Sequence, residues 1–183
     1  MGRIEGIRVA NPTDIPYIQA KIEIRREAQH QRHKLWTDGK AARRVHQFDP
    51  EFTARMYSEH RKLSKTNQKI ITQLRTQHIA LNFHLHSNYS HSKKNKPLTP
   101  NCTQCQSNTP ETVEHFLFHC DSYIVLRDHM YQELKEVDEK LDSQHISLQT
   151  VLFPKNNISF ECRIKILETV AKFVKNTNRL KFH

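Results

Sequence analysis

Three of the four cysteines in the chain lie beside a histidine in one short segment, and this array constrains the fold more than any other feature. Cys102, Cys105, His115 and Cys120 follow the spacing C-x2-C-x9-H-x4-C within 19 residues. Two close pairs of such ligands can complete a closed tetrahedral zinc site, because a short loop lets each pair bind one ion without strain. The array therefore predicts a structural Zn²⁺ site, and the alternative is a group of buried or idle thiols.

The residues between the two ligand pairs predict how the ligands are presented. Thr109 and Pro110 are typical of the N-cap and the first position of a helix, and acidic residues follow in the first turn. His115 and Cys120 are five positions apart, a little more than one helical turn. They can converge only if the helix ends or tightens near Cys120. His119, four positions after His115, is the alternative fourth ligand.

Composition favours helices and an intracellular protein. The chain of 183 residues contains only three glycines, and 8% of its residues are aromatic, which suits helices better than a turn-rich β-sandwich. No apolar run approaches the roughly 20 residues that cross a bilayer, and the N-terminus lacks the pattern of a signal peptide. We therefore expect a nuclear or cytoplasmic location, with no secretion, no transmembrane segment and no membrane partner.

Positive charge is concentrated before the cysteine array. Residues 1–100 contain 19 Lys and Arg against 8 Asp and Glu, whereas residues 101–183 contain 10 against 11. Such a basic segment suits a polyanion, and nucleic acid is the commonest intracellular one; the alternative is a solvated basic face without a partner. The side chains expected to contact RNA or DNA phosphates, without reading sequence, are Lys21, Arg25, Arg32, Arg43, Arg44, Lys69, Arg75, Lys93 and Lys94.

Hydrophobic spacing predicts a mainly α fold in four segments. Residues 1–86 form a basic helical arm that includes a long helix from residue 14 to about 36, and residues 87–101 form a polar linker. Residues 102–121 form a zinc-binding knuckle, a loop plus a short helix inserted in a helical domain. Residues 122–183 form a C-terminal region whose two helices are expected to pack antiparallel on the knuckle.

Apolar stripes also predict which side chains face inward. A helix is expected over residues 66–77, with Lys69 and Arg75 facing outward. The last helix is expected over about residues 159–178, with Cys162 at the edge of its buried face. Cys162 is therefore assigned to packing and not to metal binding.

Catalytic motifs are missing from the sequence. The chain has no phosphate-binding P-loop, no G-x-S-x-G elbow and no H-E-x-x-H helix. The clustered thiols are better used as metal ligands, which suppresses their nucleophilicity. We expect no catalytic site and no small-molecule substrate. A weaker alternative is an enzyme whose metal keeps an open position, with His119 as a base.

Neighbouring motifs carry a resemblance to a known family. The stretch LRTQHIALNFHLH at residues 74–86 is followed by CTQC at residues 102–105 and ETVEHFLFHC at residues 111–120. This order resembles the zinc-binding region at the C-terminal end of reverse transcriptase polyproteins of non-LTR (LINE-type) retrotransposons. Residues 14–36 resemble the basic helix, ending in tryptophan, that follows the ribonuclease H domain in those polyproteins. The resemblance covers roughly residues 12–135.

The resemblance implies a function and roles for individual residues. It assigns the metal to the four ligands of the array and gives Glu114 the task of orienting His115 or a nearby basic group. Gln77 departs from the family, which usually has glycine there. Polymerase, endonuclease and ribonuclease H motifs are missing, so the resemblance implies a non-catalytic, zinc-stabilised nucleic-acid-binding module that can meet other polyprotein domains. The alternatives are a protein–protein interaction module and an inactive retroelement remnant.

Overall fold

The structure is a computed structural model, and its described part is helical. It describes residues 16–38, 43–48, 55–88, 97–141, 145–155 and 157–181, with only the backbone at 43–44 and 55–57. Within those ranges the only β-type pairing is a single bridge between Asn101 and Pro110. The predicted mainly α class is confirmed. The chain divides into two compact units, residues 1–41 and 42–183.

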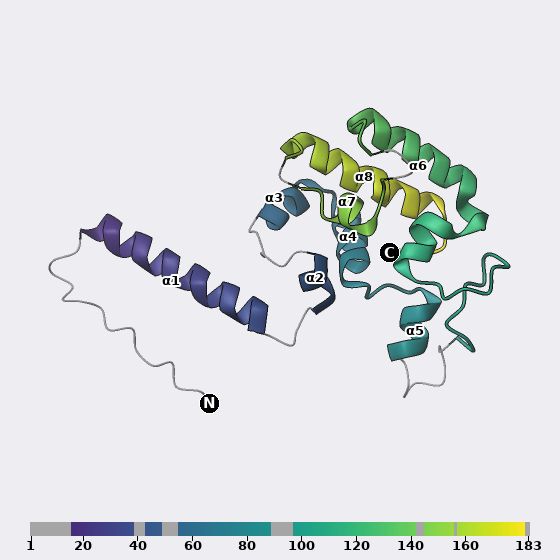
Figure 1. The fold of residues 1–183 in the computed structure, drawn as a ribbon, viewed down its shortest axis with the longest axis horizontal. Helices are drawn as coiled ribbons and strands as arrows, with labels where there is room; N and C mark the ends of the chain where they lie inside the picture. Colours follow the sequence, from purple (N-terminus) through teal and green to yellow (C-terminus); the bar gives the residue numbers. More distant parts are fainter. Residues whose placement is uncertain are drawn as a thin grey trace. The chain divides into compact units, whose positions relative to one another are not determined.

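The first unit contains α1, which runs from Tyr17 to Asp38 (Figure 1). The long basic helix predicted over residues 14–36 is thus confirmed from residue 17 onward, and residues 14 and 15 lie outside the described part. No described residue of α1 is buried. Its surface carries both charged residues and large apolar ones. None of the helices in the described ranges combines the length and apolarity needed to cross a bilayer.

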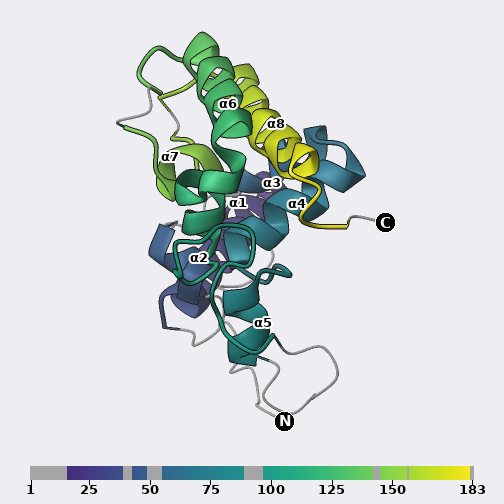
Figure 2. The same ribbon diagram turned by 90° about the vertical axis from the view of Figure 1, so that its right-hand side faces the viewer.

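The second unit is built around its last helix, α8. Figures 1 and 2 both show α6 running alongside α8, and α3, α4 and α7 also pack on α8. The bounds are α2 Arg43–Phe48, α3 Arg55–Lys62, α4 Lys65–Thr76, α5 Asn82–Asn88, α6 Ile124–Val137, α7 Leu148–Leu152 and α8 Phe160–Asn176. A π-helix, His115–His119, and a 3-10 turn, Asp121–Tyr123, precede α6.

The two C-terminal helices pack antiparallel, as predicted. Val137, at the end of α6, and Cys162, at the start of α8, line one groove between them. Leu126 and Asn176, at the opposite ends of these helices, line a second groove. Cys162 is half-buried, which agrees with its assignment to packing.

The predicted segment boundaries differ from the observed units. Helices α3 and α4 belong to the predicted basic arm, yet they share a core with α8 of the predicted C-terminal region. A buried ion pair between Glu59 of α3 and Arg163 of α8 reinforces this contact. The predicted boundary at residue 86 therefore does not divide the chain into parts with separate hydrophobic cores. Most of the predicted linker, residues 89–96, lies outside the described residues.

Arg75 is a further correction, because its side chain faces inward. Ile70, Ile71 and Leu74 of α4 are fully buried, and Arg75 is only 6% exposed. Its Nε donates to the carbonyl of Leu152 at 2.7 Å. The prediction that Arg75 faces outward is wrong because its guanidinium satisfies a carbonyl of α7, which apolar spacing within α4 could not reveal. Lys69 is exposed, as predicted.

Helix α4 ends at a residue with unfavourable backbone geometry. Gln77 is its C-cap, in the left-handed region at φ 58° and ψ 13°, and its N–H donates to the carbonyl of Leu74 at 3.2 Å. Glycine is favoured at this position because it has no Cβ to clash with the backbone.

We predict that Gln77→Gly stabilises the folded chain by about 0.5–1 kcal/mol. The substitution relieves a strain of about 1–2 kcal/mol in the left-handed backbone. It also costs up to about 1 kcal/mol, because glycine gives the unfolded chain more conformational entropy to lose on folding. Urea denaturation at fixed metal concentration measures the change. Gln73→Gly, the same substitution within α4, is the matched control and should destabilise by about 1 kcal/mol. Equal destabilisation by both variants would contradict this account of the cap.

Candidate metal centre

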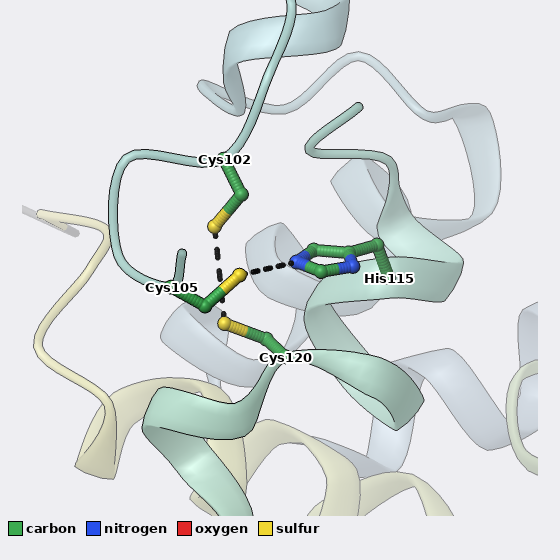
Figure 3. Close-up of side chains that lie close together, drawn as sticks. All are labelled: Cys102, Cys105, His115 and Cys120. Atoms are coloured by element: carbon green, nitrogen blue, oxygen red, sulfur yellow. Dashed lines mark hydrogen bonds between the residues drawn. The ribbon is translucent and has the colours of Figure 1, made fainter. Parts of the chain in front are cut away.

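The four predicted ligands converge on one point, as Figure 3 shows. The potential ligand atoms of Cys102, Cys105, His115 and Cys120 all lie within 4.8 Å of one another, in the part of the chain that the structure describes. Cys102 Sγ is 3.8 Å from Cys120 Sγ, and Cys105 Sγ is 3.4 Å from His115 Nε2. A tetrahedral ion bound at about 2.3 Å to sulfur and 2.0 Å to nitrogen separates two sulfurs by about 3.8 Å and a sulfur from a nitrogen by about 3.5 Å. The donor set therefore fits one tetrahedral metal ion.

A tight loop presents the first two ligands. Its ends are joined at the Asn101–Pro110 bridge, where the Cys102 N–H donates to the Thr109 carbonyl at 2.8 Å. The Gln104 N–H points to Cys102 Sγ at 3.4 Å. An N–H dipole of this kind stabilises negative charge on the sulfur. The loop thus positions Cys102 and supports its thiolate form.

The other two ligands are brought together by a π-helical turn. The Cys120 N–H donates to the His115 carbonyl at 2.8 Å, an i→i+5 hydrogen bond in place of the α-helical i→i+4 bond. This wider turn places residues five positions apart on the same side. The sequence predicted that the helix would end or tighten near Cys120. The helix does end at Cys120, where the backbone becomes extended. Its last turn is wider than an α-helical turn, whereas a tighter turn was one of the outcomes expected from the sequence.

The helix that carries His115 begins later than predicted. Thr109 and Pro110 were the expected N-cap and first helical position, but helical backbone begins at residue 113. Thr112 caps it instead, because its Oγ1 accepts a hydrogen bond from the His115 N–H at 3.0 Å. Pro110 is held in the bridge with Asn101. The loop closure needs Pro110 in extended backbone, and this requirement overrides the local helix-start signal.

Thr109 has a different part in the site, because it orients the imidazole. His115 Nδ1 lies 3.1 Å from Thr109 Oγ1, and the Ser107 hydroxyl links Thr109 to Cys105, at 2.7 and 3.0 Å. When Nδ1–H donates to the hydroxyl, Nε2 keeps its lone pair for a metal. Nε2 is also the nitrogen that faces Cys105. The hydrogen bond and the ligand direction therefore agree.

Two other residues that were assigned roles from the sequence lie outside the metal cluster. His119, the alternative fourth ligand, is not in the cluster; its side chain is exposed and its ring lies against Phe118. The π-turn selects the position five residues after His115, so the position four residues after it faces elsewhere. Glu114, expected to orient His115 or a nearby basic group, is exposed.

The carboxylate that does reach the site is Glu111, which sequence reasoning missed. It is only 1% exposed and lies 4.0 Å from Cys102 Sγ. Arg179, from the segment after α8, donates to both of its oxygens. The only sequence signal for this role was the position of an acidic residue between the two pairs of ligands. Nothing in the local pattern connects residue 111 with residue 179.

A second arginine supports the ligand-bearing turn from α6. Arg127 is buried and donates to the carbonyls of Phe118, at 2.6 Å, and Cys120. Both carbonyls lie at the end of the π-helix, and the Cys120 carbonyl also accepts a hydrogen bond from the Tyr123 N–H of the following 3-10 turn, at 3.1 Å. Arg127 thus caps the segment that presents Cys120.

Burial controls the protonation of the ligands. It raises the pKa of the Cys120 thiol to about 12, raises that of Cys102 and lowers that of His115. Burial also pushes the pKa of Cys105 upward, but hydrogen bonds with Ser107 outweigh it and lower that pKa. Two thiols therefore keep their protons unless a cation compensates the thiolate charge. A bound metal ion supplies that charge and displaces the protons.

The residues predicted to contact nucleic acid whose side chains are described lie on α1 and α4. Lys21, Arg25 and Arg32 are exposed on α1, and Lys69 is exposed on α4. Arg75 is buried and cannot serve as a surface contact without unpacking. The remaining candidates lie outside the described side chains: Arg43, Arg44, Lys93 and Lys94.

Comparison with known proteins identified no relative. No protein-family model, no curated protein and no solved structure matches the chain.

We predict that Cys120→Ser abolishes stoichiometric metal binding. Loss of a contact outside the ligand shell typically costs about 10- to 100-fold in metal affinity, so loss of a ligand should cost more than about 100-fold. Competition with a chromophoric chelator, together with elemental analysis of the purified chain, measures this. Cys162→Ser is the matched control and should keep one metal ion per chain. Full metal content in Cys120→Ser would contradict the ligand assignment.

Proposed function

We propose that the chain is a zinc-stabilised nucleic-acid-binding module, non-catalytic by itself, of the type found at the C-terminal end of non-LTR retrotransposon reverse transcriptases. The donor set of three cysteines and one histidine supports zinc, which prefers tetrahedral sulfur and nitrogen ligands. A shell closed by four protein ligands leaves no position for a reactive water. The metal therefore holds the fold and does not carry out chemistry.

The observation that best supports a polyanionic partner is the one-sided charge of α3 and α4. Glu59 is the only acidic residue between positions 52 and 110, and it is buried against Arg163. That stretch of the sequence contains no other carboxylate side chain. Among the described side chains of α3 and α4, the exposed Lys and Arg residues, here called the α3–α4 basic surface, are Arg61, Lys62, Lys65 and Lys69.

Spacing within α4 favours an extended, negatively charged ligand. Lys65 and Lys69 lie four positions apart, so they are neighbours on one face of the helix. Like charges at this spacing repel, and a phosphate backbone relieves that repulsion. In the first unit, Lys21, Arg25 and Arg32 likewise share one face of α1, because they are four and seven positions apart. These two sets are the phosphate contacts of the proposed function, and Arg75 is not among them.

A contact between the two sequence motifs at residues 74–86 and 111–120 supports the proposed resemblance to a retroelement protein. Asn82 belongs to the first motif and Glu111 to the second. The Asn82 N–H donates to Glu111 Oε2 at 2.7 Å, inside the protein. The motifs are thus parts of one structural unit and not independent matches. In a full polyprotein such a module would hold template RNA or target DNA near the polymerase.

We predict salt-dependent nucleic-acid binding that weakens when Lys65 and Lys69 are both changed to Gln. Each neutralised phosphate contributes about 0.9 to the slope of log affinity against log salt on duplex DNA, so the double variant should lose about 2 units of slope. Fluorescence anisotropy with duplex and single-stranded oligonucleotides over a salt series measures this. Wild-type chain that does not bind at physiological ionic strength would overturn the proposed function.

A matched control comes from another exposed pair of lysines. Lys135→Gln with Lys140→Gln removes the same charge from α6 and the turn after it. This control should bind with nearly the wild-type slope. An equal loss in both double variants would mean that net charge, and not the α3–α4 basic surface, determines affinity.

A second candidate function, protein–protein interaction, is favoured by the apolar side chains of α1. Tyr17, Ile18, Ile24 and Leu35 are 69–78% exposed. Exposed apolar residues on one helix are common at protein interfaces. Concentration-dependent self-association in sedimentation velocity, lost on Ile24→Lys, would favour this candidate. A monomer at all concentrations with salt-dependent oligonucleotide binding would favour the first.

A further inference from the structure

Glu111 and Arg179 connect the metal-binding loop to the segment that follows α8. Arg179 Nε donates to Glu111 Oε1 at 2.8 Å, and Arg179 Nη2 donates to Glu111 Oε2 at 2.7 Å. This is the bidentate geometry in which arginine and carboxylate bind most strongly. The Glu111 side chain is 1% exposed and that of Arg179 is 17% exposed. The pair is therefore largely shielded from water.

Asn82 completes this arrangement from a third segment, the start of α5. Its backbone N–H donates to Glu111, and its side-chain Nδ2 donates to the Asn101 carbonyl at 2.8 Å. Its Oδ1 accepts from Arg179 Nη2 at 3.3 Å. We call Asn82, Glu111 and Arg179 the clasp. Asn101 immediately precedes Cys102, so the clasp holds the chain directly beside a ligand.

The clasp also sets the charge near the metal. Three thiolates, a neutral imidazole and a divalent cation together carry a single net negative charge. Glu111 Oε1 lies 4.0 Å from Cys102 Sγ, and an unpaired carboxylate there would repel the thiolate. Arg179 neutralises that carboxylate from the other side. Its own pKa is raised by hydrogen bonding to Glu111, so it remains cationic.

We propose that Glu111 and Arg179 are positioning residues of the metal centre, which fix the Cys102 arm of the loop and make the order of residues 177–181 depend on the metal. This inference rests on the proposed zinc binding. The ion is held by the four ligands, and the clasp acts through Cys102. The zinc-bound loop and the segment after α8 therefore stabilise each other, although residues 102–120 and residues 177–181 are far apart in the sequence.

Zinc affinity of clasp variants tests the proposal. Competition with a chromophoric chelator should show about 10- to 100-fold weaker zinc binding for Glu111→Gln and for Arg179→Gln, with helix content retained by circular dichroism. Arg179→Lys keeps the charge but loses the bidentate geometry, so it should fall between Arg179→Gln and the wild type. The double variant Glu111→Gln with Arg179→Gln should bind zinc no more weakly than the weaker-binding single variant, because the two residues act as one unit. Additive losses would contradict this.

Two controls match these changes in charge. Glu114→Gln and Lys181→Gln alter exposed residues beside the loop and beside Arg179, and both should bind zinc like the wild type. The absorption spectrum of the Co²⁺-substituted chain is a further readout. Glu111→Gln should change its ligand-field bands, and Glu114→Gln should not. Clasp variants with wild-type affinity and spectrum would overturn the inference and leave the proposed function intact.

Hydrogen exchange on the unmodified chain gives an independent test that does not depend on how the variants fold. Addition of zinc should slow exchange in residues 101–105 and also in residues 177–181. Protection of the loop alone would overturn the inference. If the wild-type chain binds no zinc at all, both the inference and the zinc part of the proposed function fail.

Discussion

The hydrogen bond from the Cys120 N–H to the His115 carbonyl is the interaction on which the site depends most. By widening one turn, it directs both ligands to the same side. The residues between them serve the interior: Phe116 and Leu117 are at most 1% exposed, and the Phe116 ring lies 5.8 Å from that of Phe173 on α8. One irregular turn thus serves the metal on one face and the helical core on the other.

The two basic residue types are used differently in this fold. Arg75, Arg127 and Arg163 are buried, where their guanidinium groups donate to carbonyls or to a carboxylate. Every lysine whose exposure is described is exposed. Arginine tolerates burial better because its planar fork satisfies several acceptors and is more weakly hydrated than an ammonium group. The net charge of the chain therefore overstates how much positive charge lies on its surface. Lys65 and Lys69 of α4 contribute to that surface charge, whereas Arg75 is buried.

Sequence reasoning succeeded where the determining interactions are local. The spacing of Cys102, Cys105, His115 and Cys120 was enough to predict their convergence, since each pair lies on one short loop or turn. The α1 and α8 helices followed from periodicity in the same way. It failed where a distant segment decides: α7 supplies the acceptor for Arg75, and residue 179 supplies the partner for Glu111. Pairings separated by this many residues leave no periodic trace in a single sequence.

The predicted knuckle is attached to the helical core at several points. Its turn packs on α8 through Phe116, its loop is tied to the segment after α8 through Glu111, and α8 in turn supports α4. Because core packing is dense, strain at one element passes to those it touches. A metal ion bound at the cluster would therefore stabilise, through α8, the helix that presents Lys65 and Lys69. In the proposed function, the metal would matter for the phosphate contacts in this way: it would fix the scaffold on which their spacing depends.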